Sequence, residues 1–241
     1  MKAIFKREMN AYFTSPLAYF IIGSFLALTG LNFWNINLVN RSIEFSNTIN
    51  SVSSFLAFFM PIITMKMFAE EKRNGTEVLL RTSPVKIWKI VLGKYSAALA
   101  LFVLMVVCTF VCPIILSFNM MEVTDITPVF PWAKTFGSYI GFILLGSAYI
   151  SIGLLASSFS ENATLSAVIG MVILLLLSFV ENIGTQLGGT IGSVMVWISL
   201  SSRYDDFATG LFNLTSIVYY LTFTFVILFI TTVNIERKRW N

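Results

Sequence analysis

Few side chains in this sequence are of the types that carry covalent or acid–base chemistry. The 241 residues include no histidine, so histidine-based catalysis and histidine metal ligation are excluded. The two cysteines, Cys108 and Cys112, are four positions apart in an apolar run, which places them on one face of a helix. A local disulfide is geometrically unfavourable there. We interpret both as buried thiols that pack like small hydrophobic side chains, with a metal or redox role as the lesser alternative.

A nucleotide-binding loop is also missing from the sequence. The pattern G-x-x-x-x-G-K-(S/T), whose backbone cradles phosphate groups, does not occur, and Gly93-Lys94 lacks both the upstream glycine and the following hydroxyl residue. Acidic residues and cysteines do not gather at one depth, as a catalytic site within a membrane would require. We therefore predict that this chain is not an enzyme, holds no metal or cofactor, and depends on another chain for any ATP-driven step.

One charged segment, residues 70–84, separates two long apolar runs and reads Glu-Glu-Lys-Arg-Asn-Gly-Thr-Glu-Val-Leu-Leu-Arg-Thr-Ser-Pro. We expect the preceding helix to end at Asn74-Gly75, because glycine accepts the left-handed conformation that follows a helix. Thr76 can cap a new short helix, Glu77–Arg81, whose first acidic residue complements the helix dipole. Ser83-Pro84 is then a favourable start for the next long helix.

The short helix should lie across the direction of its neighbours. It presents three adjacent apolar residues, Val78 to Leu80, with charges at both ends. Exposed apolar clusters of this kind usually mark a contact surface. We therefore predict a cytoplasmic handle on which a soluble partner can act. The alternative is a solvated polar loop that only joins two spans.

Composition places the rest of the chain in a membrane. Hydrophobic residues make up 56% of the sequence and charged residues 12%, whereas soluble domains carry roughly 25% charged residues. Spanning helices need about 20 mostly apolar residues. Six predicted spans cover residues 17–34, 52–68, 87–118, 136–159, 163–180 and 212–233. Pro61 is expected to kink the second span, and the third is long enough to project beyond the bilayer at its Lys89–Lys94 end.

The basic residues orient these spans. With the N-terminus in the cytoplasm, Arg41, Lys134 and Arg203 are the only ones of the 16 Lys and Arg that fall outside, while the acidic residues divide evenly. This asymmetry follows the positive-inside rule and predicts both termini in the cytoplasm. The same flanking pattern argues against nucleic-acid binding, despite the net charge of +4. The first apolar run exceeds the roughly 7–15 residues of a signal-peptide core, so we expect it to stay as a span.

An amphipathic helix over residues 1–15, lying in the cytoplasmic interface, is predicted before the first span. Its apolar face comprises Phe5, Met9, Tyr12 and Phe13. Glu8 falls within this apolar arc, so the pattern is imperfect. The alternative is a frayed basic N-terminus that only orients the chain.

Residues 184–206 are too apolar for a free loop, yet their apolar runs are too short to cross. Glycines at positions 184, 188, 189 and 192 interrupt them, which predicts a re-entrant helical hairpin in the outer leaflet. In the fourth span, Gly137 and Gly141 form a small-xxx-small pair that permits close helix contact. We favour packing within the subunit over a contact between subunits.

Several stretches carry a family resemblance. Residues 70–85, EEKRNGTEVLLRTSPV, resemble the cytoplasmic loop of ABC-2 type transporter permeases, although the usual spacer between Thr76 and Glu77 is missing. YFTSPLAY at 12–19 resembles the start of their first span, and GLLASSFSEN at 153–162 resembles the turn between spans four and five. SLSSRYDDFATG at 199–210 resembles the segment before span six. The nearest subgroup is that of gliding-motility-associated permeases.

This resemblance implies an all-α membrane protein with six transmembrane helices, an N-terminal interfacial helix, a cytoplasmic coupling helix and re-entrant helices before the last span. It also implies the permease subunit of an ATP-driven transporter, most simply an exporter, in the bacterial cytoplasmic membrane. Its partners would be a second permease (identical or related), two cytoplasmic ATPase subunits that bind ATP and Mg²⁺, and membrane lipid. An extracytoplasmic accessory protein is a further partner to consider.

In that family the coupling helix docks in a cleft of the ATPase. The resemblance assigns this role in the present chain to Glu71, Lys72, Gly75, Thr76, Glu77, Leu79 and Leu80. An apolar path along spans one, two and five would suit a lipid-like or amphiphilic cargo.

The alternative function is an ATP-independent channel or carrier, or a membrane scaffold without transport. The scarcity of ionisable residues within the spans argues against a proton-coupled carrier. A secondary transporter should also show interrupted spans in both halves, whereas only one interrupted segment is visible here.

Overall fold

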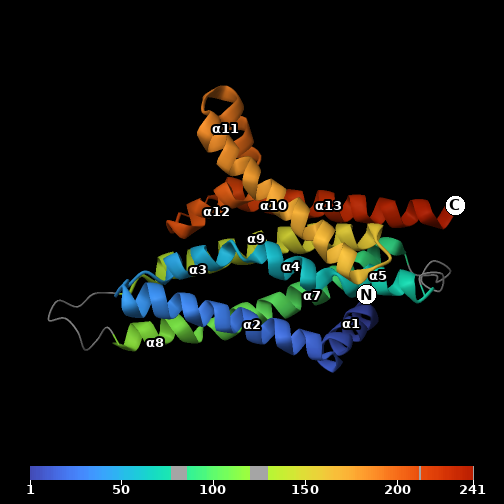
Figure 1. Ribbon diagram of the computed structural model, residues 1–241, viewed down its shortest axis with the longest axis horizontal. Helices are drawn as coiled ribbons and strands as arrows, with labels where there is room; N and C mark the ends of the chain where they lie inside the picture. Colours follow the sequence, from blue (N-terminus) through green and yellow to red (C-terminus); the bar gives the residue numbers. More distant parts are fainter. Residues whose placement is uncertain (77–85, 120–129, 212, 241) are drawn as a thin grey trace.

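The computed structural model describes residues 1–76, 86–119, 130–211 and 213–240 (Figure 1). Within these ranges every regular element is a helix. The elements are α1 (Lys2–Thr14), α2 (Pro16–Phe33), the π-helix η1 (Trp34–Val39), α3 (Phe45–Ser53), α4 (Leu56–Thr64), α5 (Lys66–Arg73), α7 (Ile87–Thr109), α8 (Val111–Asn119), α9 (Trp132–Phe159), α10 (Ala163–Leu187), α11 (Gly189–Ile198), α12 (Leu200–Ala208) and α13 (Leu214–Trp240).

Five helical segments are long and apolar enough to cross a membrane. They are Pro16–Val39, Ile87–Phe118, Trp132–Phe159, Ala163–Leu187 and Leu214–Arg237. A sixth results if α3 and the rod made of α4 and α5, which meet at an angle of 56°, count as one bent span. Most of these segments run along the longest axis of the molecule (Figure 1). The prediction of an all-α membrane protein is confirmed, with five or six candidate spans.

Helix α9 is the centre of the bundle. In its most apolar stretch 78% of the residues are buried, compared with at most 39% in the other four single spans. Glycines let neighbouring helices approach it closely: a Cβ built on Gly146 would lie 2.2 Å from the Phe102 ring, and one on Gly141 would lie 2.5 Å from Phe207 Cβ. The Gly141 contact is therefore made within the subunit, as the sequence favoured.

The bend in the second predicted span does not lie at Pro61. Helix α4 continues through Pro61, whose ring packs where Gly170 of α10 has no side chain: a Cβ there would be 3.1 Å from Pro61 Cβ. The chain bends earlier, between α3 and α4. There the Ser53 hydroxyl donates to the Asn50 carbonyl at 2.7 Å, a local bond that competes with helix continuation. The 56° bend of this span thus lies before Pro61, and a kink at Pro61 itself stays a prediction.

The third predicted span, 87–118, consists of two helices. Helix α7 ends at Thr109 and α8 begins at Val111. Pro113 has no N–H to donate to the Thr109 carbonyl four residues earlier, and its ring disturbs that turn, so the ladder is interrupted at this point.

A helical hairpin projects from the bundle. Helix α10 runs seven residues beyond the predicted end of span five at position 180, to Leu187, and α11 turns back along it. Gly188 and Gly189 make the turn with φ of +60° and +66°. A Cβ on Gly192 would lie 2.5 Å from the Gly184 carbonyl oxygen, so these glycines allow the two helices to touch. Figure 1 shows α11 pointing away from the body. Its depth in a leaflet stays a prediction.

The two chain ends lie toward the same end of the bundle as α1, α5 and the turn between α9 and α10 (Figure 1). We call this the terminal end. Helix α2 leads away from it, and α3 to α5 return to it, so the segment that follows α5 starts there.

Candidate functional site

Helix α5 is the foot of the charged segment. It ends at Arg73, and the Asn74 and Gly75 N–H groups donate to the carbonyls of Glu70 and Lys72, each at 3.0 Å. Gly75 has φ +68°, so the predicted helix stop at Asn74-Gly75 is confirmed. The Thr76 hydroxyl donates back to the Glu71 carbonyl at 3.2 Å.

Four charged residues meet beside this foot. The Lys94 ammonium of α7 lies 2.9 Å from Glu71 Oε1 and 3.0 Å from Glu8 Oε1 of α1, and it donates to the Met67 carbonyl at 2.6 Å. The Arg7 guanidinium pairs with Glu8 at 2.8 Å and also with Glu71. We call Arg7, Glu8, Glu71 and Lys94 the charge cluster.

The charge cluster is electrically balanced, and three of its four side chains are largely removed from water, whereas Arg7 is 56% exposed. The Lys94 side chain is only 1% exposed, while those of Glu8 and Glu71 are 12% and 14% exposed. The Glu8 carboxylate, which accepts a hydrogen bond from Arg7, raises the pKa of that guanidinium, so Arg7 stays charged. A buried ion pair is costly to break because the remaining charge is left without compensation.

Two sequence irregularities are explained by this arrangement. Glu8 interrupts the apolar face of α1 because it points at Lys94. Lys94, at the end of the third span that we expect to project beyond the bilayer, is buried against Glu8 and Glu71. The projection of this end stays a prediction. Only the presence of an acid on an apolar face and a base within an apolar helix could have signalled the pair.

A serine from α9 is inserted into the backbone between α4 and α5. Ser157 Oγ accepts from the N–H groups of Phe68 and Ala69 at 3.0 and 3.2 Å, and donates to the Met65 carbonyl at 3.1 Å. In an unbroken α-helix the Ala69 N–H would bond directly to the Met65 carbonyl. A side chain inserted into the ladder is a recognised cause of a helix break. Ser157 therefore both interrupts the rod and fastens it to α9.

Two further bonds join α5 to α9 and α13. The Lys72 ammonium donates to the Ser158 carbonyl, and the Asn234 amide of α13 donates to Ser158 Oγ at 2.8 Å. Close by, a Cβ on Gly153 would lie 2.2 Å from Thr64 Oγ1, so α9 and α4 touch where glycine leaves room.

Helix α1 packs on the other side of the rod. Phe5, Met9 and Tyr12 pack against the core, and the Tyr12 hydroxyl donates to the Ile63 carbonyl at 2.8 Å. Burial raises the pKa of Tyr12, which keeps the phenol neutral and able to donate. Phe13 does not join this face: it is 38% exposed, and its ring lies 6.4 Å from that of Tyr19.

A family model described as ABC-2 family transporter protein matches residues 13–196 of the chain. The chain belongs to this ABC-2 family. It is thus a permease of an ABC transporter, a membrane subunit that works with an ABC ATPase and often with a second permease. The matched region contains Glu71, Lys94 and Ser157, whereas Arg7 and Glu8 precede it. No curated protein matches the chain.

The positions predicted for coupling in this ABC-2 permease divide into two groups. Glu71 and Lys72 lie in the last turn of α5, Gly75 and Thr76 directly follow it, and all four bond as described above. Glu77, Leu79 and Leu80 lie outside the described residues, as do the predicted short helix and the Ser83 cap. The contacts of Lys94 and Ser157 were not anticipated from the sequence.

The contacts around α5 join it to α1, α7 and α9. Among the described residues, no group of three or more His, Cys, Asp or Glu could hold a metal ion. Instead, side chains of α1, α7 and α9 form ion pairs and hydrogen bonds with the last two turns of α5. A force applied beyond Asn74 would therefore reach several helices of the permease together.

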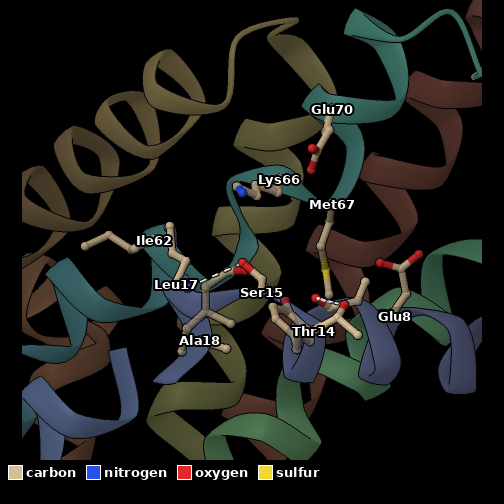
Figure 2. A pocket seen from close by; sticks show the side chains of 12 residues that line it. Glu8, Thr14, Ser15, Leu17, Ala18, Ile62, Lys66, Met67 and Glu70 are labelled. Carbon is tan, nitrogen blue, oxygen red and sulfur yellow. Dashed lines mark hydrogen bonds between the residues drawn. The ribbon is translucent and has the colours of Figure 1, made fainter. Parts of the chain in front are cut away.

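A cavity of about 240 Å³ opens beside the same rod (Figure 2). It lies between α1, the start of α2 and the α4–α5 rod. Its polar lining includes Glu8, Thr14, Ser15, Lys66 and Glu70, and its apolar lining includes Leu17, Ala18, Ile62, Ile63 and Met67.

Proposed function

We propose that this ABC-2 permease is driven by a separate cytoplasmic ATPase and that force enters it through residues 70–84. The observation that carries this proposal is the ion pair of Glu71 with Lys94, at 2.9 Å, at the point where the charged segment leaves the bundle. A loop that merely connected two spans would need no buried charged anchor at its foot, because burying charge is costly.

The proposed mechanism has three steps. ATP, held with Mg²⁺ by two ATPase subunits, closes those subunits on each other. The coupling helix after Asn74 moves with the cleft in which it sits and pulls on α5. Because Lys94 and Ser157 bind α5 to α7 and α9, the displacement tilts these helices against a second permease and opens or closes a path between the two.

Direction and location belong to the same proposal. A topology with both termini in the cytoplasm is supported by the distribution of Lys and Arg and by the position of the termini at the end where α5 ends. Export across a bacterial cytoplasmic membrane rests on the family resemblance. A lipid-like or amphiphilic cargo is compatible with the apolar spans. An extracytoplasmic accessory protein and membership of the gliding-motility subgroup stay predictions that rest on motif resemblance alone.

The test is reconstitution of the permease with a candidate ATPase in lipid. We expect a stable complex whose ATPase rate exceeds that of the soluble subunit alone. Lys94→Met should lower the permease-dependent part of the rate, whereas Lys89→Met, on an exposed position of the same helix, should leave it unchanged. A permease that transports cargo at full rate without any ATPase would overturn the proposal in favour of a channel or carrier.

A further inference from the structure

The cavity between α1, α2 and the α4–α5 rod has a mixed lining that the coupling role leaves unexplained. Lys66 and Glu70 are exposed and lie one turn apart on α5. Neither side chain has an ion-pair or hydrogen-bond partner among the described residues, and the two are not bonded to each other. Figure 2 shows both on the α5 side of the cavity, with Thr14 and Ser15 on the opposite side.

One cation and two carboxylates thus surround an apolar floor. Lys66 can bind a phosphate, and Glu70 can accept hydrogen bonds from an ammonium. Glu8 adds a second carboxylate, although one of its oxygens is already held by Lys94 and Arg7. A ligand with adjacent phosphate and ammonium groups complements this set, whereas a purely anionic ligand would face two acids.

The size and surroundings of the cavity favour the headgroup of a lipid. Pockets for whole drug-sized ligands hold roughly 300–1,000 Å³, so a volume of about 240 Å³ suits a headgroup but not an entire amphiphile. Acyl chains need an apolar surface next to the headgroup. The cavity offers one at its edge, where Leu17 of α2 and Ile62 of α4 belong to the lining and are partly exposed.

We propose that this cavity binds the headgroup of an aminophospholipid of the phosphoethanolamine type, with the phosphate at Lys66, the ammonium at Glu70 and the acyl chains along α2. A bound headgroup would touch α1, α2 and α5 at once. Its binding would therefore hold these three helices in a fixed arrangement next to the end of α5. The activity of the permease would then depend on the lipid composition of the membrane leaflet around the cavity. This goes beyond the coupling function and does not depend on the ATPase.

The test uses the full-length chain in detergent with equimolar phosphatidylethanolamine, phosphatidylcholine and phosphatidylglycerol. Retained lipid is identified by native mass spectrometry. We expect phosphatidylethanolamine to be retained about tenfold over phosphatidylglycerol, the effect of one charge-assisted hydrogen bond. Phosphatidylcholine should be retained less, because its quaternary ammonium has no hydrogen to donate. Soluble phosphoethanolamine should not displace the lipid, since it lacks acyl chains.

Variants locate the site. Glu70→Lys should turn the preference toward phosphatidylglycerol, and the milder Glu70→Gln should reduce it. Ala11→Trp should fill the cavity from α1 and abolish the preference, while Ala3→Trp, exposed on the same helix and away from the cavity, should keep it. Equal retention of the three lipids by the wild type, an unchanged preference in Glu70→Lys and Ala11→Trp, or full displacement by soluble phosphoethanolamine would each overturn the proposal.

Discussion

The Lys94 ammonium of α7 and the Glu71 carboxylate of α5 lie 2.9 Å apart at the foot of the charged segment. Glu71 lies near the start of the segment that we propose as the coupling element, and Lys94 follows its end in the sequence, so the pair fixes the base of that segment. Glu8 Oε1, 3.0 Å from the same ammonium, adds α1 to the base. A handle that transmits force needs such a base, because a loosely held foot would move without moving the spans.

Replacing Lys94 should destabilise the permease strongly. Lys94→Met leaves the carboxylates of Glu8 and Glu71 without their shared buried cation, and breaking a buried pair in this way costs about 3–5 kcal/mol. The measurement is the free energy of unfolding of the purified chain in detergent, with circular dichroism as the signal. Lys89→Met is the matched control and should change stability little. Equal stability of the two variants would show that Lys94 is not an anchor.

Removing the Ser157 hydroxyl should loosen the join between α4, α5 and α9. Ser157→Ala leaves the Phe68 and Ala69 N–H groups and the Met65 carbonyl without this partner, and an unsatisfied buried polar group costs about 1–3 kcal/mol. The control is Ser151→Ala on the same helix, because Ser151 donates only within α9, to the Ala148 carbonyl at 2.6 Å. We expect faster amide hydrogen exchange at residues 65–69 in Ser157→Ala but not in Ser151→Ala. Unchanged exchange in Ser157→Ala would contradict the role of Ser157 in fastening α5 to α9.

A methyl group at Gly153 should push α9 away from α4. In Gly153→Ala the new Cβ would meet Thr64 Oγ1 at 2.2 Å, a distance that requires something to shift. Overpacking of this kind typically costs about 1–3 kcal/mol. Thr64→Ala should restore much of the lost stability in the double variant, measured as the unfolding midpoint. Failure of this rescue, with Gly153→Ala destabilised, would place the clash elsewhere.

A charge in the predicted coupling helix should uncouple the partner without unfolding the permease. Leu79→Asp puts a carboxylate into the apolar group that we expect to enter the ATPase cleft, and burying an unpaired charge there is strongly unfavourable. Copurification with the ATPase and stimulated ATPase activity should be lost while the elution profile of the permease stays normal. Retained stimulation would favour the solvated-loop interpretation.

Sequence reasoning succeeded where the signal was local. Asn74-Gly75 stops α5 because of glycine's own conformational freedom. The apolar runs predicted membrane helices because their composition alone requires a lipid environment.

It failed where the outcome depended on a distant partner. The 56° bend of the second span follows Ser53, which no proline or glycine marks, while the ring of Pro61 packs where Gly170 of α10 has no side chain. Ser157 looks like one more small residue in a serine-rich stretch, and nothing nearby in the sequence says that it enters the backbone of α5. Glu8 and Lys94 each break a local pattern, but only the fold shows that they break it for each other.

The most direct test of the central claim is the ATPase rate of the reconstituted complex containing Gly75→Pro. Gly75 has φ +68° and donates its N–H to the Lys72 carbonyl. Proline cannot adopt this φ and has no N–H, so the substitution would change the backbone between α5 and the predicted coupling helix. The charge cluster would be left intact. We predict that the complex still assembles but that ATPase activity falls to the rate of the ATPase without permease. A stimulated rate equal to that of the wild-type complex would contradict the entry of force through this segment.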